Sequence, residues 1–349
     1  MADREIENEY DIVIVGAGPA GCSLANFLSK DFSVLMIDWS RFPRDKPCGG
    51  LLIDESLDIL KNLDMPDNIF SYPKTLKLKM IDWDNDMEVV HKKKLVNVNR
   101  RSFDYWLLKL SEKKVQFSSE TKLVDFKERD DGVHVLIEKS SKKILVKTKY
   151  LIGADGGFSS IRRRISPENE TKFYVAVQEW IRSSKSIGDF TYFIYDNEIN
   201  DYYSWIIPKG NYMIMGSFVL QGDDVRSKFQ LFKNKVSERF GIHGMTYKKE
   251  AGLEPRPMTA DEICLGRGSA ILLGEAACFV SPWSGEGISF ALRSGMAAAN
   301  ALNSHFDDAL ERYKKACEPL VEEIGEKIEK AKALMDPAMR KDVLAKISK

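Results

Sequence analysis

The chain has 349 residues, 44% of them hydrophobic, and its 52 Lys and Arg balance its 52 Asp and Glu. This length suits two domains or one elaborated domain with a sizeable core. The zero net charge disfavours nucleic-acid binding and leaves at most peripheral membrane contact. Five cysteines without a CxxC pair favour neither a disulfide framework nor a metal site, and no run is long enough to span a membrane. With no signal peptide ahead of the first strand, we expect a cytoplasmic protein.

The first predicted element is a buried parallel strand at Ile12–Val15. The sequence GAGPAG follows at Gly16–Gly21, then a helix at Cys22–Leu28 and a second strand at Ser33–Ile37 that ends at Asp38. In this fingerprint the glycines permit a tight turn, close approach of the backbone to a pyrophosphate and close packing of the helix. The carboxylate of Asp38 can accept hydrogen bonds from ribose hydroxyls. The pattern predicts a site for FAD or NAD(P).

The segment Trp39–Gly50 is rich in proline, glycine and charge, which predicts a loop over the mouth of the cofactor site. Its end, PCGG at Pro47–Gly50, is unusual because adjacent glycines allow the backbone to approach a ligand. The apolar spacing of Leu51–Leu63 predicts a helix.

Period-two alternation at Thr75–Met80 and Met87–Leu95 predicts a hairpin, and Asn99–Leu110 has helical spacing. We expect further short strands at Val115–Phe117, Lys122–Phe126, Val133–Glu138 and Ile144–Lys149.

A short apolar strand starting at Tyr150 leads into GADGG at Gly153–Gly157, and Ser159 and Ser160 then begin a helix with three arginines. Placed between a strand and a helix, Asp155 is a candidate for holding cofactor riboses or phosphates. The arginines are most simply a charged helix face, although one could reach a phosphate.

The tract Phe173–Leu220 alternates and is rich in aromatic residues, which predicts an antiparallel sheet with one aromatic face. This face could be plain core or the wall of an apolar substrate pocket. A helix is expected at Phe229–Phe240, and Glu254–Pro257 is expected to break the chain.

The last diagnostic stretch is a buried strand at Ala270–Gly274 with Glu275 at its tip, followed by an Ala-rich helix that Gly285–Gly287 opens. The partial positive charge of a helix N-terminus suits the anionic reduced flavin. After Phe306 the chain is charged and helical, which predicts a capping helix pair or, less simply, an oligomer contact.

Together these motifs resemble the geranylgeranyl reductase family of FAD-dependent oxidoreductases, which has the p-hydroxybenzoate-hydroxylase-like, glutathione-reductase-like FAD fold. The resemblance is carried by the following motifs: GAGPAG at Gly16–Gly21, PRDKPCGG at Pro43–Gly50, RxxFD at Arg100–Asp104, ADGGFSSIRR at Ala154–Arg163, YSWIIPKG at Tyr203–Gly210 and GEAACFVSPWSGEGI at Gly274–Ile288.

The resemblance implies FAD as cofactor. We expect it to be bound by Gly16, Gly18, Pro19, Ala20, Gly21, Asp38, Trp39, Arg44, Cys48, Gly49, Arg100, Asp155, Gly274, Glu275, Gly285, Glu286, Gly287 and Ile288. Cys48, Gly49 and Gly50 are the expected catalytic residues, and Tyr203, Trp205, Pro208 and Trp283 the expected substrate pocket.

Three positions depart from the family pattern: Asp38 replaces glutamate, Glu275 replaces aspartate, and Trp283 replaces a smaller residue and could narrow the pocket.

The predicted fold is α/β, with a Rossmann FAD domain (1–73, 98–165 and 255–305), an inserted antiparallel substrate domain (74–97 and 166–254) and a helical tail (306–349). The expected function is reduction of C=C bonds in a prenyl-type or other hydrophobic substrate, with electrons from NAD(P)H or a small redox protein. A FAD-dependent monooxygenase or halogenase using O2, and a flavin-binding protein without turnover, are the alternatives. Cys48 is expected to lie near the flavin, as a proton donor or as a residue that shapes the site.

Overall fold

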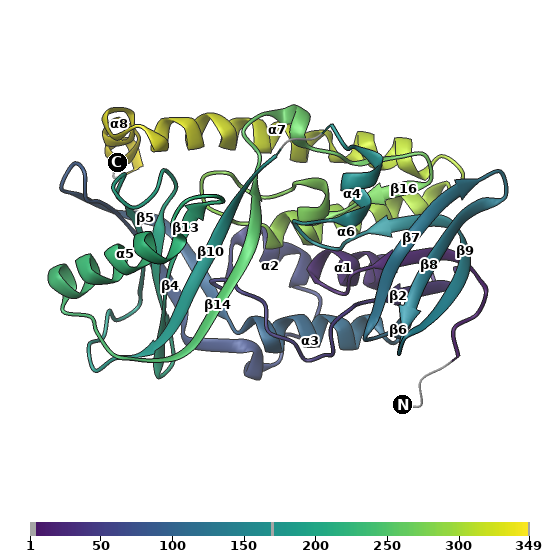
Figure 1. Ribbon diagram of the computed structural model, residues 1–349, viewed down its shortest axis with the longest axis horizontal. Helices are drawn as coiled ribbons and strands as arrows, with labels where there is room; N and C mark the ends of the chain where they lie inside the picture. The colour runs from purple at the N-terminus through teal and green to yellow at the C-terminus, as the bar shows by residue number, and fades with distance from the viewer. Residues whose placement is uncertain (1–4, 169–170, 348–349) are drawn as a thin grey trace.

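The computed structural model describes residues 5–168 and 171–347 and contains two eight-stranded sheets (Figure 1). In sheet A the order is β15-β16-β9-β1-β2-β6, and β7 and β8 extend it from β9 as an antiparallel hairpin. Its strands are β1 (Glu9–Val15), β2 (Val34–Ile37), β6 (Gln116–Ser118), β7 (Thr121–Arg129), β8 (Gly132–Lys139), β9 (Lys142–Gly153), β15 (Gly266–Arg267) and β16 (Ala270–Leu272). The central strands β16, β9, β1, β2 and β6 are parallel, as expected of a dinucleotide-binding sheet.

Helices α1 (Pro19–Phe27), α3 (Arg100–Ser111) and α6 (Ile288–Ser304) pack together beside sheet A. A Cβ on Gly295 would lie 2.5 Å from the Ala20 carbonyl oxygen, so the close crossing of α1 and α6 needs this glycine. Shorter elements complete the layer: α2 (Asp54–Leu60), α4 (Ser160–Ile165) and the 3-10 turns η1 (Asp67–Ile69), η2 (Ala260–Glu262) and η3 (Gly274–Ala277).

Sheet B has the order β14-β10-β13-β12-β11-β4-β5-β3 and is mostly antiparallel. Its strands are β3 (Leu51–Leu52), β4 (Phe70–Asp82), β5 (Met87–Val98), β10 (Lys172–Arg182), β11 (Phe190–Tyr195), β12 (Ser204–Lys209), β13 (Tyr212–Leu220) and β14 (Met245–Arg256). Helix α5 (Val225–Phe240) covers one face, packing Phe229, Phe232 and Val236 against it. The opposite face carries a second aromatic cluster that includes Phe193, Tyr203, Trp205 and Phe218.

The C-terminal helices α7 (Ala309–Met335) and α8 (Pro337–Ile347) run along the length of the molecule at the top of Figure 1. Helix α7 packs on α6, and α8 reaches β5 of sheet B. The α/β class with two sheets and a helical tail is confirmed. The division of the chain into three domains stays a prediction.

Three local predictions were wrong. The expected helix at Leu51–Leu63 is strand β3 followed by α2, because Leu51 and Leu52 pair with β5. The expected strands at Ile144–Lys149 and from Tyr150 are one strand, β9. The expected break at Glu254–Pro257 comes later, since β14 runs through Pro255, which an edge strand tolerates.

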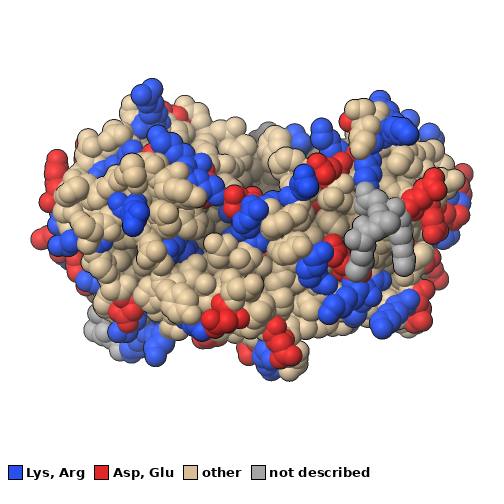
Figure 2. Space-filling view, turned by 90° about the horizontal axis from the view of Figure 1, so that it is seen from below, with Lys and Arg blue, Asp and Glu red and all other residues tan. Residues whose placement is uncertain are grey.

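On the face shown in Figure 2, lysines and arginines are interspersed with acids, in keeping with the zero net charge. Within residues 5–168 and 171–347, no helix is long and apolar enough to cross a membrane, and no group of side chains is suited to hold a metal ion.

Candidate active site

A cavity of about 660 Å³ lies where the carboxyl ends of the parallel strands meet the loop after β2 and the start of α6. Most of the residues expected to bind the cofactor line it: Gly16, Gly18, Pro19, Ala20, Asp38, Trp39, Arg44, Arg100, Asp155, Glu275, Gly287 and Ile288. Three stretches far apart in sequence therefore meet at the place where this type of sheet binds dinucleotides. We call this the cofactor cavity.

The glycine fingerprint has the expected geometry. Gly16 has φ +109°, and a Cβ on Gly21 would lie 2.0 Å from the Gly16 carbonyl oxygen. Gly21 thus serves helix packing and does not itself line the cavity. Asp38 accepts hydrogen bonds from the Ala17 N–H (2.9 Å) and the Ser40 N–H (2.8 Å), so its carboxylate also orders the glycine turn.

Two guanidinium groups share one buried carboxylate at the edge of the cofactor cavity. Arg100 makes a bidentate pair with Asp104 (2.8 and 2.9 Å), and Arg44 lies 3.4 Å from the same carboxylate. Burial alone would raise the pKa of Asp104, but Arg100 and Arg44 outweigh it and lower that pKa. One anion against two cations leaves a net positive charge, which suits a pyrophosphate.

Asp155 provides the clearest test of whether a ribose-bearing cofactor fits. Its Oδ2 accepts hydrogen bonds from the Ser160 N–H and hydroxyl (2.8 and 3.0 Å). Its Oδ1 is buried and has no hydrogen-bond partner among the described residues, although Asp155 lines the cofactor cavity. Buried acceptors are nearly always satisfied, so this oxygen fits a cofactor hydroxyl.

Glu275 is one of the three positions that depart from the family pattern. Its carboxylate pairs with Lys46 at 2.9 and 3.1 Å and also accepts from the Gly157 N–H. Burial raises the pKa of Glu275, but Lys46 outweighs it and the net shift is downward. Gly274 packs against Ala20 and Ala291 without lining the cavity. Among the three arginines of α4, Arg162 is buried and donates to backbone carbonyls, so it is structural.

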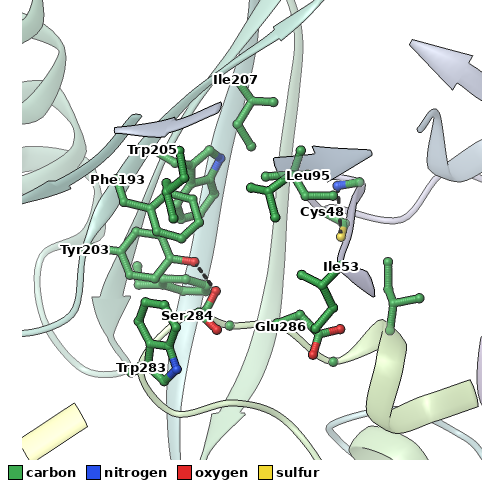
Figure 3. A pocket seen from close by; sticks show the side chains of 18 of the residues that line it. Cys48, Ile53, Leu95, Phe193, Tyr203, Trp205, Ile207, Trp283, Ser284 and Glu286 are labelled. Atoms are coloured by element: carbon green, nitrogen blue, oxygen red, sulfur yellow. Dashed lines mark hydrogen bonds between the residues drawn. The ribbon is translucent and has the colours of Figure 1, made fainter. Parts of the chain in front are cut away.

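A second cavity, of about 510 Å³, lies on the aromatic face of sheet B, and we call it the apolar cavity. Figure 3 shows Phe193, Tyr203 and Trp205 of the sheet on one side, with Cys48 and Ile53 opposite. The apolar cavity and the cofactor cavity share Pro47, Gly287 and Ile288 as lining residues. The two spaces therefore adjoin at the N-terminus of α6.

Phe193, Tyr203 and Trp205, which we call the aromatic wall, belong to the hydrophobic core of sheet B and also line the apolar cavity. Tyr203 and Trp205 are buried, and the Tyr203 hydroxyl donates to the Ser284 carbonyl oxygen at 2.5 Å. The Trp205 indole lies across Gly216, where a Cβ would be 2.3 Å from the ring. Pro208 does not line the cavity, because the period-two alternation of β12 turns it to the face opposite Trp205. Pro208, expected at the substrate pocket, thus lies away from the apolar cavity in the structure.

Cys48, Gly49, Gly285 and Glu286 were expected at the cofactor but line the apolar cavity instead. The Cys48 Sγ accepts from the Gly50 N–H at 3.3 Å. Glu286 caps α6, accepting from the Ser289 N–H (2.6 Å) and hydroxyl (2.7 Å).

Lys209 holds the Pro47–Gly50 loop in place, a role that sequence reasoning missed. Its buried Nζ donates to the carbonyl oxygens of Gly50 (3.4 Å) and Val98 (2.8 Å) and to Asn97 Oδ1 (2.5 Å). Burial lowers the pKa of Lys209 to about 7. Gly50 itself has φ +61°, and a Cβ there would lie 2.3 Å from the Val98 oxygen, so only glycine fits.

At the open end of the apolar cavity, Lys330 of α7 lies over the Trp283 ring, with Nζ 3.5 Å from the ring centroid. Lys93 and Lys327 also line this end but are paired, with Glu55 and Glu323 respectively. Burial, followed by the charges of Lys327 and Lys93, lowers the pKa of Lys330 to about 8. We call this part of the cavity the mouth.

Sequence reasoning also missed Glu254, which lines the apolar cavity from β14. Its Oε1 is buried and unpartnered within the described part of the chain. The Pro-Arg-Pro that follows it suggested a chain break, and the strand before it lacks an apolar pattern, so no signal pointed to it.

Residues 9–327 match the sequence profile of the family described as FAD binding domain. The chain therefore belongs to this FAD-binding family, and FAD is its cofactor. It is 31% identical to the protein CbrA of Escherichia coli O9:H4 (strain HS) over 341 residues, which cover 96% of this chain and 93% of CbrA.

Solved structures show the same fold. A geranylgeranyl bacteriochlorophyll reductase-like protein from Thermoplasma acidophilum superposes with a TM-score of 0.86 at 18% identity, covering 98% of this chain and 92% of that one. The p-nitrophenol 4-monooxygenase PnpA from Pseudomonas putida gives a TM-score of 0.76 at 16% identity, covering 98% and 94%. At these identities the likeness shows the fold alone, and the fold serves both reductases and monooxygenases.

Proposed function

We propose that this protein is a FAD-dependent reductase that saturates an isolated C=C bond in a prenyl-type or other hydrophobic substrate. The observation that carries the proposal is the apolar cavity with its aromatic wall, which adjoins the cofactor cavity at Gly287 and Ile288. Bound FAD supplies hydride when reduced. The aromatic rings of the wall bury large apolar area and suit a flexible hydrocarbon chain.

The chain's own residues fit this chemistry. Helix α6 points its N-terminus, with the partial positive charge of its first backbone N–H groups, at the junction of the two cavities, where negative charge on a reduced flavin would be stabilised. Arg44, Arg100 and Asp155 would hold the pyrophosphate and a ribose. The electron donor would be NAD(P)H or a small redox protein.

The mouth supports an anionic head group on the substrate. Lys330 is half-buried and has no carboxylate partner among the described residues, and a phosphate there would pair with it. The substrate class proposed is therefore an amphiphile with an unsaturated chain in the apolar cavity and an anionic group at Lys330.

The test uses FAD-loaded enzyme reduced with dithionite under argon, mixed with prenyl diphosphates and the matching prenyl alcohols of increasing chain length. We expect products heavier by two hydrogens, formed without O2 and seen by mass spectrometry. Lys330→Met should raise KM for the diphosphates but not for the alcohols, whereas Lys332→Met, an exposed lysine on the same helix, should leave both unchanged. Products that require O2 and contain its oxygen would instead establish the monooxygenase.

A further inference from the structure

Glu254 is an acid with a buried carboxyl oxygen in the wall of the apolar cavity. It lines the apolar cavity two residues before the end of β14, next to the turn that precedes α6. A Cβ on Gly285 would lie 2.9 Å from its Oε1 and 3.0 Å from the Phe218 ring, so carboxyl, ring and turn are in close contact. We propose that Glu254 is the proton donor of the reaction, an inference that rests on the proposed function.

Oε1 of Glu254, the oxygen that would carry the proton, makes no hydrogen bond to the described residues. This oxygen is buried, even though the residue lines a cavity. An ionised carboxylate without a partner would be strongly disfavoured in this surrounding, whereas a neutral carboxylic acid keeps one O–H to donate. A substrate in the cavity would be its natural acceptor.

The charges around Glu254 also favour the neutral acid. The titratable groups that act on it or are acted on by it are Glu275, Glu286, Cys48, Lys46, Tyr202 and Tyr203. Lys46, the cation among them, is paired with Glu275. Burial first, then Glu275 and Cys48, raise the pKa of Glu254 well above its usual value.

The chemical step balances with this residue. One alkene carbon receives hydride and the other receives a proton, so the Glu254 O–H bond breaks as the second C–H bond forms. The carboxylate left behind regains its proton from water. Cys48, which the sequence suggested either as a proton donor or as a residue that shapes the site, accepts a hydrogen bond from the Gly50 N–H at its sulfur. We therefore expect Cys48→Ala to slow the reaction less than Glu254→Gln does.

Protonation can be measured without any substrate. At neutral pH the infrared spectrum of FAD-loaded wild type should contain the carbonyl stretch of a protonated carboxylic acid that Glu254→Gln removes and Glu198→Gln, at an exposed glutamate, retains. The pKa of Glu254 in the folded protein lies above the ordinary 4.5, so the folded protein holds this proton more tightly than the unfolded chain does. The resulting stabilisation is fully present below pH 4.5 and is lost as pH rises through the folded-state pKa. Glu254→Gln should therefore gain stability relative to wild type as pH rises.

The decisive experiment mixes reduced, FAD-loaded enzyme with a prenyl diphosphate under argon and follows flavin reoxidation. Glu254→Gln should bind FAD normally but reoxidise about 10²–10⁴-fold more slowly than wild type, as loss of a general acid does. Glu254→Asp should retain part of the wild-type reoxidation rate, and the control Glu198→Gln should reoxidise at the wild-type rate. An unchanged rate in Glu254→Gln, or no protonated-acid band, overturns the assignment. Wild-type enzyme that no prenyl compound reoxidises overturns the proposed function instead.

Discussion

Asp155 in the cofactor cavity and Glu254 in the apolar cavity each have a buried carboxylate oxygen without a hydrogen-bond partner among the described residues. Such oxygens are rare because leaving a buried acceptor unpaired is unfavourable by about 1–3 kcal/mol. Both therefore point to ligand atoms. Asp155 is placed to accept from ribose hydroxyls, whereas burial raises the pKa of Glu254, which suits that carboxyl to donate.

The first prediction concerns Asp155. Asp155→Asn retains an oxygen for Ser160 but replaces the unpartnered oxygen with an amide, so the dissociation constant for FAD should rise roughly tenfold to a hundredfold. Titration of apo-protein with FAD, followed by flavin fluorescence, measures this. Asp125→Asn, at an exposed aspartate that pairs with Arg164, is the control. Equal FAD affinity in the Asp155 variant would show that this oxygen faces no cofactor atom.

At the scale of the element, strand packing decides the shape of the apolar cavity. Gly216 of β13 makes room for the Trp205 indole of β12, because the two residues pair directly across the strands. A methyl group at this position must push the indole into the cavity, since the sheet backbone lies behind it.

The second prediction is that Gly216→Ala gives a folded, FAD-bound protein with a narrower cavity. The KM for the longest prenyl chain should rise severalfold relative to the shortest, measured with the same diphosphate series. Gly252→Ala is the matched control, since a Cβ there would meet only Pro47 at 3.6 Å. If the Gly216 variant keeps the chain-length preference of wild type, the Trp205 indole does not contact the substrate chain.

Elements with local signals could be predicted, and those defined by distant partners could not. The Gly16–Gly21 fingerprint and the alternation of β4 and β5 carry their own patterns. Strand β3 looks helical in sequence because only its pairing with β5 makes it a strand. Strand β14 (MTYKKEAGLEPR) has no sustained alternation of apolar and polar residues, so neither it nor Glu254 was apparent. Aromatic content indicated the aromatic face of sheet B, as core or as pocket wall. Trp205 and Pro208, three residues apart on β12, lie on opposite faces because side chains alternate along a strand.

At the scale of the whole molecule, the C-terminal tail joins the two halves and completes the mouth. Helix α7 packs on α6 and carries Lys330 to Trp283. Beyond it, Arg340 of α8 is buried and bonds Asp82 of β4 at 2.9 and 3.0 Å, with further bonds to Asp84 and Asn197. The tail is thus fastened to sheet B by a buried ion pair.

The third prediction is that Arg340→Met lowers the free energy of unfolding by about 3–5 kcal/mol, because Asp82 is left as a buried, unpaired charge. Urea denaturation measures the loss. Adding Asp82→Asn should recover part of it, and Lys341→Met, at the exposed neighbour, should have no effect. A loss below 1 kcal/mol would mean that the tail is held by its apolar contacts alone.

In the proposed function, a hydrophobic alkene in the apolar cavity takes electrons from FAD in the adjoining cofactor cavity. The most direct test of this electron transfer is stopped-flow absorbance of reduced, FAD-loaded wild-type enzyme mixed anaerobically with a prenyl diphosphate. We expect the oxidised flavin spectrum to return without O2, at a rate that saturates with alkene concentration. A flavin that stays reduced until O2 is admitted, whatever alkene is present, would contradict it.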